Sequence, residues 1–600
     1  MRFWDRDVPR WFCWVLGLAL AAAFAVYGPQ LNHPLLKFDD SFLITRNAAV
    51  QHLNLKTLFH VFTTYDPELY IPLTFLSYQV QVALFGMQPW AFHAVNLLLH
   101  MGSTVLVALL VLRLTRRPAA AIVAALVFCL HPLQVEAVLW ASARKDVLST
   151  LLSLSTILLY LRYRDDESRR GLLIACAITF VLALLAKVHA VVVPALLLVI
   201  DGFEGRKPHR KSAEIIGGFF ALAGLFLLIA VLGKIRLLGE TNFGTDVLLL
   251  CKSALFYLQA FFWPAHLSLL YSQSTPVMLA SLEFLVPVLF VLGLATVALL
   301  ARRKHPILAL GVVWYLVALV PSVASFAKNG FLFFASDRYA YVAIIGVAIV
   351  VGWIFDLLLD RLSVQKLVLP LTVALVLLLG WGTVRQVHAW TDEETLFQTV
   401  VDRYPGTAMA WNNLAVEKML KGQTDQAVAL FGKAIELSPD YTVPYRNIAN
   451  IAFDSGDPAA ATQGYARVME ILRAKHAWTG EDVETASSYA LLLESSGRPV
   501  DAFAILQETL QHAPQFGEAH YNVGIKLQQQ GKMAEAVLEL AQSVRLSPQH
   551  TDAWYHYAAV LAELGRLPEA MEALREVLWL DPESEKAREH YENMRKMVEG

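Results

Sequence analysis

Apolar runs dominate the first 390 residues of this 600-residue chain, and short charged loops separate them. Hydrophobic residues make up 56% of the sequence and charged residues only 17%, which is less charge than a soluble protein of this size carries. Runs of this kind approach the length of about 20 residues that a helix needs to cross a bilayer. The sequence therefore predicts an all-α fold whose first part, residues 1–390, is a multi-span membrane domain.

Basic clusters between the runs set the predicted topology, because Lys and Arg concentrate in cytoplasmic loops. The clusters begin at Arg2, Arg113, Arg162, Arg206, Arg302 and Arg361. Placing all of them in the cytoplasm predicts about eleven transmembrane helices, with the N-terminus inside and the C-terminal part outside. The predicted spans are 10–28, 90–112, 119–139, 146–163, 171–186, 188–201, 213–236, 278–301, 306–326, 338–359 and 366–386.

Two further apolar pieces, 70–86 and 246–270, must stay on the outer side if this topology holds. Both are predicted to be interfacial or re-entrant helices. The run 188–201 is short for a span. Residues 1–28 have features of a signal peptide, but the many later spans favour an uncleaved first helix.

The sequence becomes amphipathic and repetitive after residue 390. Glycines recur with spacings of 34, 41, 34 and 34 residues, and an alanine follows each one five positions later. The glycines are Gly422, Gly456, Gly497, Gly531 and Gly565. This period predicts an α-solenoid of about five tetratricopeptide repeats over 391–600, with a seven-residue insertion near 476–482. Such arrays form a concave groove that commonly holds an extended peptide, and a structural stalk is the alternative.

Composition gives no support to nucleic-acid binding or to a cysteine metal site. The formal net charge of −2 gives no sign of nucleic-acid binding. The four cysteines lie in apolar stretches without metal-ligand spacing, so they are predicted to be small buried hydrophobic residues.

Acids and bases gather on the outer face in the predicted topology. Carboxylates at a membrane mouth are costly to desolvate, which favours a chemical role for them, although a solvated loop alone could also explain the first pair. The outer residues are Asp39, Asp40, Glu136, Arg144, Asp146, Lys187, His189 and Arg338. The apolar interior beneath them would suit a lipid tail.

The run that begins at Pro89 carries His93, Asn96 and His100 on one helical face. A stripe of hydrogen bonds between helices is the favoured interpretation, and contact with a ligand is the alternative.

Five short motifs along the first part of the chain carry a family resemblance: Asp39-Asp40, Tyr70–Thr74, Phe92–His100, His131-Pro132 with Glu136–Val138, and Asp337–Tyr339. With them, nearly the whole chain resembles the transmembrane and tetratricopeptide-repeat-containing O-mannosyltransferases, which are multi-span glycosyltransferases of the GT-C type. The resemblance implies transfer of mannose from a polyprenyl-phosphate donor to a protein hydroxyl outside the cytoplasm. It also implies that Asp39-Asp40 is the catalytic centre. Asp337-Arg338 stands where relatives often show Glu-Arg.

The chemistry of such a transfer suits these residue types. A Ser or Thr hydroxyl is a poor nucleophile, so a carboxylate must accept its proton. Negative charge favours the oxocarbenium-like transition state, and cations such as Arg144, Lys187 or Arg338 stabilise the phosphate that leaves. Because adjacent side chains usually point apart, the two carboxylates are predicted to divide the roles, with Asp39 as the base. Asp40 is predicted to orient the site, and to bind a divalent cation if one takes part.

Glu136, Asp146, His93 and His189 complete the predicted substrate-binding set. The sequence thus predicts an inverting, integral-membrane glycosyltransferase whose external repeats hold a protein acceptor. The compartment is a bacterial inner membrane with periplasmic repeats, or the endoplasmic reticulum with lumenal repeats in a eukaryote. The alternatives are a GT-C enzyme that glycosylates a lipid or polysaccharide and a non-enzymatic, membrane-anchored peptide-binding scaffold. A transporter is disfavoured, because its charges should lie near the bilayer midplane.

Overall fold

The computed structural model describes residues 9–65, 69–206, 210–234, 242–328, 331–360, 365–475 and 478–599. The chain divides into two compact units, residues 1–404 and 405–600. The predicted all-α class is confirmed. In the described part of the chain, strands are limited to β1 (Tyr271–Ser272), β2 (Ala327–Lys328) and β3 (Phe331–Ala335), which pair antiparallel in the order β1-β3-β2.

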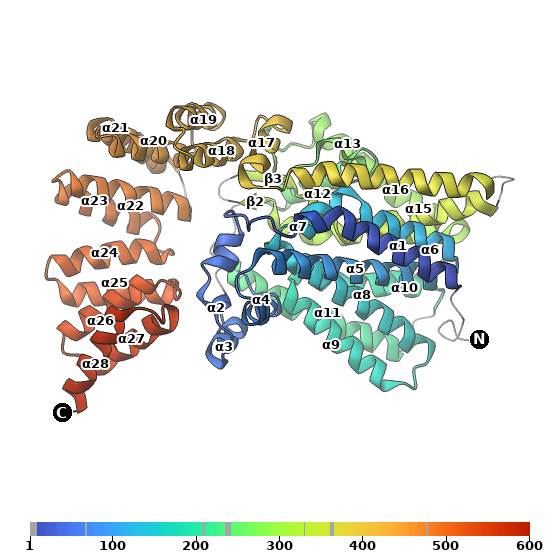
Figure 1. Ribbon diagram of the computed structural model, residues 1–600, viewed down its shortest axis with the longest axis horizontal. Coiled ribbons are helices and arrows are strands. Elements are labelled where there is room, and N and C mark those ends of the chain that lie inside the picture. The colour runs from blue at the N-terminus through green and yellow to red at the C-terminus, as the bar shows by residue number, and fades with distance from the viewer. Residues whose placement is uncertain are drawn as a thin grey trace. The chain divides into compact units, whose positions relative to one another are not determined.

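Long apolar helices make up most of the first unit, and α1, α5, α6 and α16 lie side by side (Figure 1). The helices are α1 (Arg10–Tyr27), α2 (Ala48–Gln51), α3 (Leu55–Thr63), α4 (Pro72–Phe85), α5 (Pro89–Thr115), α6 (Pro118–Leu130), α7 (Val135–Leu139), α8 (Arg144–Asp165), α9 (Arg170–Ala186), α10 (Val193–Phe203), α11 (Arg210–Lys234), α12 (Phe243–Phe262), α13 (Leu282–Lys304), α14 (Pro306–Leu319), α15 (Ala343–Asp360), α16 (Gln365–His388) and α17 (Glu393–Arg403).

Seven helices among the described residues are long and apolar enough to cross a membrane, fewer than the eleven predicted. They are Arg10–Gln30, Pro89–Thr115, Arg210–Gly233, Phe243–Phe262, Leu282–Lys304, Pro306–Val323 and Pro370–His388. The pair α6 and Pro132–Leu139, bent by 54°, would make an eighth. The predicted spans 171–186, 188–201 and 338–359 correspond to apolar helices of 10–17 residues. The span 146–163 falls in α8, where Ser and Thr residues lower the hydropathy.

The two apolar pieces that were predicted not to cross the membrane, 70–86 and 246–270, form helices of different length. Helix α4 has only 14 residues and is too short to span the bilayer. Helix α12 has 20 residues and is apolar enough to cross, so length and hydropathy do not support an interfacial position for 246–270. The sidedness derived from the basic clusters stays a prediction.

Two of the predicted cytoplasmic clusters meet in one ion-pair network. Arg113, at the end of α5, contacts Asp165 of α8 at 2.8 Å and Glu204 beyond α10 at 2.5 Å. Arg206 contacts the same Asp165 at 2.7 Å. The network therefore ties the ends of three helices together. Arg2, Arg6 and Arg361 lie outside the described residues.

Replacing Arg113 with alanine is expected to destabilise the protein by about 3 kcal/mol, because the change leaves two partly buried carboxylates without this cation. Unfolding of the purified protein in mixed micelles with increasing SDS measures this loss. Arg303→Ala, which removes an exposed arginine at the end of α13, is the matched control and should change little. Equal stability of the two variants would contradict the expectation.

Paired helices form the second unit: α18 (Ala408–Leu420) with α19 (Thr424–Leu437), α20 (Thr442–Asp454) with α21 (Pro458–Ala474), α22 (Gly480–Ser495) with α23 (Pro499–His512), α24 (Gly517–Gln529) with α25 (Met533–Leu546), and α26 (Thr551–Glu563) with α27 (Leu567–Leu580), followed by α28 (Glu585–Glu599). The glycine of each predicted repeat has φ between 74° and 83°, the left-handed conformation that ends the first helix of the pair. The alanines five positions later are buried, which lets the paired helices approach closely. Residues 476–477 of the predicted insertion lie outside the described residues.

His520 of α24 links two elements of this array. Its Nδ1 lies 2.6 Å from Glu539 Oε2, and its Nε2 lies 2.9 Å from the Pro514 carbonyl oxygen. Both ring nitrogens face acceptors, so the array favours the doubly protonated ring. The hydrogen bond to Glu539 accordingly raises the pKa of His520 above its ordinary value of 6.5.

Stability of the second unit is expected to depend on pH through His520. A raised pKa in the folded state contributes stability below the unfolded pKa of about 6.5, and this contribution is lost as pH rises through the folded pKa. The second unit has its own apolar core, so residues 405–600 can be studied alone. Urea unfolding at pH 6 and pH 8 should show a difference of up to about 1 kcal/mol that His520→Gln abolishes. A difference that persists in the variant would assign the effect to another group.

Candidate functional site

A strap of four residues, 139–142, begins at the last residue of α7 and leads toward the start of α8, and side chains from other elements hold its backbone. His93 and Asn96 reach it from α5, and Tyr78 reaches it from α4. The contacts are His93 Nδ1 to the Leu139 carbonyl oxygen at 2.9 Å, Asn96 Nδ2 to the Trp140 carbonyl oxygen at 2.9 Å, and the Tyr78 hydroxyl to the Ala141 carbonyl oxygen at 2.8 Å.

His93, which the sequence predicted to bind substrate, instead contacts backbone oxygens of the strap and of a neighbouring loop. The second ring nitrogen of His93 lies 3.2 Å from the His33 carbonyl oxygen, so both nitrogens face backbone oxygens. His93 is buried, and it connects helices as the favoured interpretation of the stripe predicted.

Asp40 holds the fourth residue of the strap. The Asp40 carboxylate is fully buried, and it accepts hydrogen bonds from the Leu36 amide at 3.0 Å and the Ser142 amide at 2.8 Å. The Ser142 hydroxyl also donates to it. Burial raises the pKa of Asp40 to about 6, although these hydrogen bonds act in the opposite direction. The geometry fits an orienting role.

The residues present do not fit a metal at Asp40. Both carboxylate oxygens already accept hydrogen bonds. No group of three His, Cys, Asp or Glu side chains in the described chain is arranged to hold a metal ion.

Asp39 is half-buried, and its carboxylate interacts with other residues than the Asp40 carboxylate does. It interacts electrostatically with Lys145 at the start of α8 and with Arg338 of the 3-10 helix η9 (Asp337–Ala340). The two neighbouring carboxylates thus have separate surroundings. Lys145, which lies between two predicted site residues, was missing from the predicted set.

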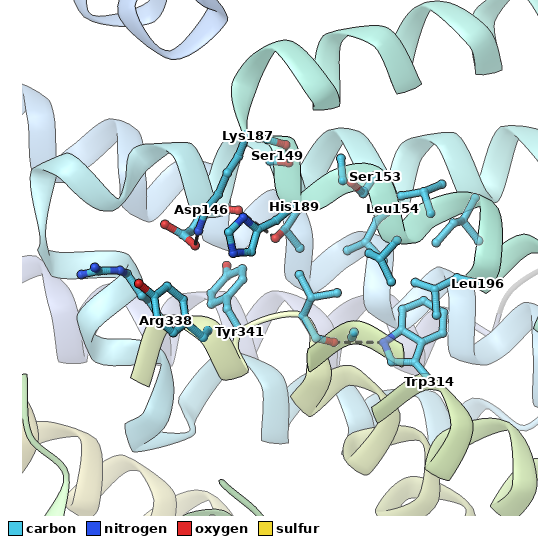
Figure 2. Close-up of a pocket in the computed structure, with 18 residues that line it drawn as sticks. Asp146, Ser149, Ser153, Leu154, Lys187, His189, Leu196, Trp314, Arg338 and Tyr341 are labelled. Carbon is cyan, nitrogen blue, oxygen red and sulfur yellow. Dashed lines mark hydrogen bonds and ion pairs between the residues drawn. The ribbon is translucent and has the colours of Figure 1, made fainter. Parts of the chain in front are cut away.

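A cavity brings four of the predicted residues together. Asp146, Lys187, His189 and Arg338 gather toward one end, and an apolar wall continues from them (Figure 2). The wall includes Leu154, Ile157, Val193, Leu196, Trp314 and Ala318, from α8, α10 and α14. Lys187 Nζ lies 2.5 Å from Asp146 Oδ1, and the second oxygen of Asp146 is buried without a hydrogen-bond partner among the described residues.

Glu136 stands behind Arg338 rather than at the cavity. The Glu136 carboxylate is fully buried and lies 2.9 Å from Arg338 Nη1, and it accepts a hydrogen bond of 2.6 Å from the Ser336 hydroxyl. The Arg338 guanidinium also lies 4.5 Å from the centre of the Trp140 ring. Glu136 was predicted to bind substrate, but its geometry is that of a residue that holds Arg338 in place.

Arg144 is also turned away from the cavity. Its Nε donates to Asn96 at 3.0 Å, its Nη2 donates to the Phe92 carbonyl at 3.0 Å, and its guanidinium lies 4.6 Å from the Tyr78 ring centre. The predicted phosphate ligand is thus a fully buried residue that packs between α4, α5 and α8. Lys187 and Arg338 are the predicted phosphate ligands that line the cavity.

Fold and site together define a polytopic helical protein that has a charged cavity and carries tetratricopeptide repeats. The Tetratricopeptide repeat family matches residues 408–441 and 527–589. The crystal structure of YrrB, a TPR protein with an unusual peptide-binding site, matches 33% of this chain and 97% of its own, with 19% identity and a TM-score of 0.24.

The chain is similar to protein O-mannosyl-transferases over most of its length, as the sequence predicted. It is 25% identical to Protein O-mannosyl-transferase TMTC1 of Homo sapiens over 453 residues, which covers 65% of this chain and 50% of the relative. It is 24% identical to Protein O-mannosyl-transferase TMTC4 of Homo sapiens, which covers 66% of this chain and 62% of the relative. The chain therefore spans about half to three-fifths of the length of these relatives.

Proposed function

We propose that this protein is an integral-membrane glycosyltransferase that moves mannose from a polyprenyl-phosphate donor to a Ser or Thr hydroxyl of a protein outside the cytoplasm. One observation carries the proposal: a single cavity joins the cations Lys187 and Arg338 to an apolar wall. This combination suits a ligand with a phosphate head and a hydrocarbon tail. The similarity to protein O-mannosyl-transferases supports the same chemistry.

In this proposal Lys187 and Arg338 bind the donor phosphate. Charge-assisted hydrogen bonds to phosphate are stronger than neutral ones, and a guanidinium can form two in parallel. Glu136 and Trp140 fix the guanidinium before the donor arrives, which is the arrangement that electrostatic catalysis requires. Isoprenoid units bury apolar area along the wall, each Å² contributing about 25 cal/mol.

Transfer then proceeds by a single displacement. The acceptor hydroxyl oxygen attacks the anomeric carbon, and Asp39 takes the hydroxyl proton. The bond from the anomeric carbon to the phosphate oxygen breaks, and its electron pair leaves with the phosphate toward Lys187 and Arg338. The unpartnered oxygen of Asp146 places negative charge in the same cavity, which favours an oxocarbenium-like transition state.

The repeats present the protein acceptor in this proposal. A transfer assay tests the whole assignment. Wild-type protein purified in detergent is incubated with radiolabelled polyprenyl-phosphate mannose and total secreted proteins. Transfer of label to protein supports it, and preference for another lipid-phosphate sugar would change the donor. Failure with all such donors, together with peptide binding by residues 405–600, would favour the scaffold instead.

A further inference from the structure

Helix α17 packs with the first unit, although the sequence assigned it to the repeat domain that begins at residue 391. Its buried side chains include Leu396, Phe397, Val400 and Val401. The division between the two units falls after Tyr404, directly beyond this helix. Helix α17 is therefore the last element of the membrane unit before the chain continues into the repeats.

The start of α17 holds the loop that carries Asp39. Glu393 is buried, and its Oε1 accepts a hydrogen bond of 2.8 Å from the Phe38 amide. Its Oε2 lies 3.9 Å from Lys37 Nζ. The centre of the Phe38 ring lies 6.0 Å from the centre of the Phe397 ring of α17. Both the backbone and the side chain of Phe38, the residue before Asp39, are therefore held by α17.

The end of α17 reaches the loop that carries Arg338. The Tyr404 ring lies 5.1 Å from the Tyr271 ring, and the Tyr271 hydroxyl donates to Asp337 at 2.7 Å. Asp337 directly precedes Arg338. Helix α17 thus supports Phe38, the neighbour of the proposed base Asp39, and Asp337, the neighbour of the proposed phosphate ligand Arg338. These two positions lie far apart in the sequence.

We propose that α17 is a positioning element of the catalytic unit and that Glu393 is the positioning residue for Asp39. The inference rests on the proposed role of Asp39 in transfer, and Glu393 itself touches no substrate. Loss of the Glu393 carboxylate releases the Phe38 amide and lets the loop shift. A displacement of about 1 Å at a reacting group can cost on the order of a hundredfold in rate.

Hydrogen–deuterium exchange and steady-state kinetics on the full chain test this inference. The variants are Glu393→Ala, Glu393→Gln and the matched control Gln398→Ala, an exposed residue of α17 whose amide donates to Asp402 on the same helix. Exchange in the peptide covering 36–40 should become at least tenfold faster in Glu393→Ala. It should stay unchanged in Gln398→Ala and in Glu393→Gln, whose amide oxygen can still accept the Phe38 N–H.

For transfer, kcat should fall ten- to a hundredfold in Glu393→Ala while the donor KM stays within threefold, and Glu393→Gln should recover most of the rate. Unchanged exchange at 36–40 in Glu393→Ala overturns the inference. If wild-type protein transfers no sugar, the proposed function fails, and exchange still decides whether Glu393 holds the loop. Glu393→Asp, one methylene shorter, replaces the alanine variant if that variant does not fold.

Discussion

Replacing Asp39 with asparagine is expected to lower the rate of sugar transfer by about a thousandfold, because a positioned general base contributes 10²- to 10⁴-fold. Asparagine has nearly the same shape but cannot take the hydroxyl proton, and it removes negative charge beside the forming oxocarbenium. Asp39 is only half-buried, so the variant should fold normally. Initial rates at saturating donor measure the effect directly.

Two comparisons make this result specific. Asp440→Asn changes an exposed carboxylate of the repeat unit and should leave the rate unchanged. The unfolding temperature of Asp39→Asn in detergent should match that of wild type. Retention of more than a tenth of the wild-type rate by a folded Asp39→Asn protein would remove Asp39 from the role of base.

Replacing Arg338 with alanine is the second large effect, and it should lower kcat by about 10²- to 10³-fold. Losing one group that stabilises developing charge typically costs this much. Arg338→Lys should recover only part of the rate, because an ammonium cannot reproduce the planar contacts with Glu136 and Trp140. Transfer rates of both variants, measured with the same donor, check that Arg338→Lys is more active than Arg338→Ala and less active than wild type.

The Arg338→Ala variant is also expected to be less stable than wild type, and this loss needs a separate control. Arg338→Ala leaves the fully buried Glu136 carboxylate without its cation, at a cost of about 3–5 kcal/mol. Combining Arg338→Met with Glu136→Gln removes both charges and should restore the unfolding temperature without restoring transfer. Recovery of activity in this double variant would show that Arg338 acts through folding alone.

Periodicity made the repeats predictable, because a tetratricopeptide unit is defined by local spacing. Gly422 and its equivalents have the left-handed φ that the spacing implies, and Ala427 and its equivalents are buried. The spans were less predictable, since a short apolar helix inside a bundle has the composition of a short transmembrane segment. The sequence places α17 with the repeats because it is amphipathic like them, whereas the contacts of the structure group it with the first unit.

The site was predictable in residue type more than in position. Asp146, Lys187, His189 and Arg338 line one cavity. His93, Glu136 and Arg144 were also chosen for their polarity, but each is buried and bonded to protein groups. A buried polar group must find a partner, and these partners lie dozens to hundreds of residues away. A single sequence gives no sign of such pairings.

Side chains from other parts of the protein contact the main chain at every residue of the strap 139–142, and Asp40 also accepts a hydrogen bond from the Ser142 hydroxyl. At position 140 the contact from Asn96 is made to the carbonyl oxygen, a group that every residue type carries. The Trp140 side chain itself is buried and lies against Arg338, Phe38 and Trp390. A substitution at position 140 therefore changes the surroundings of the Arg338 guanidinium while the carbonyl oxygen that Asn96 contacts remains.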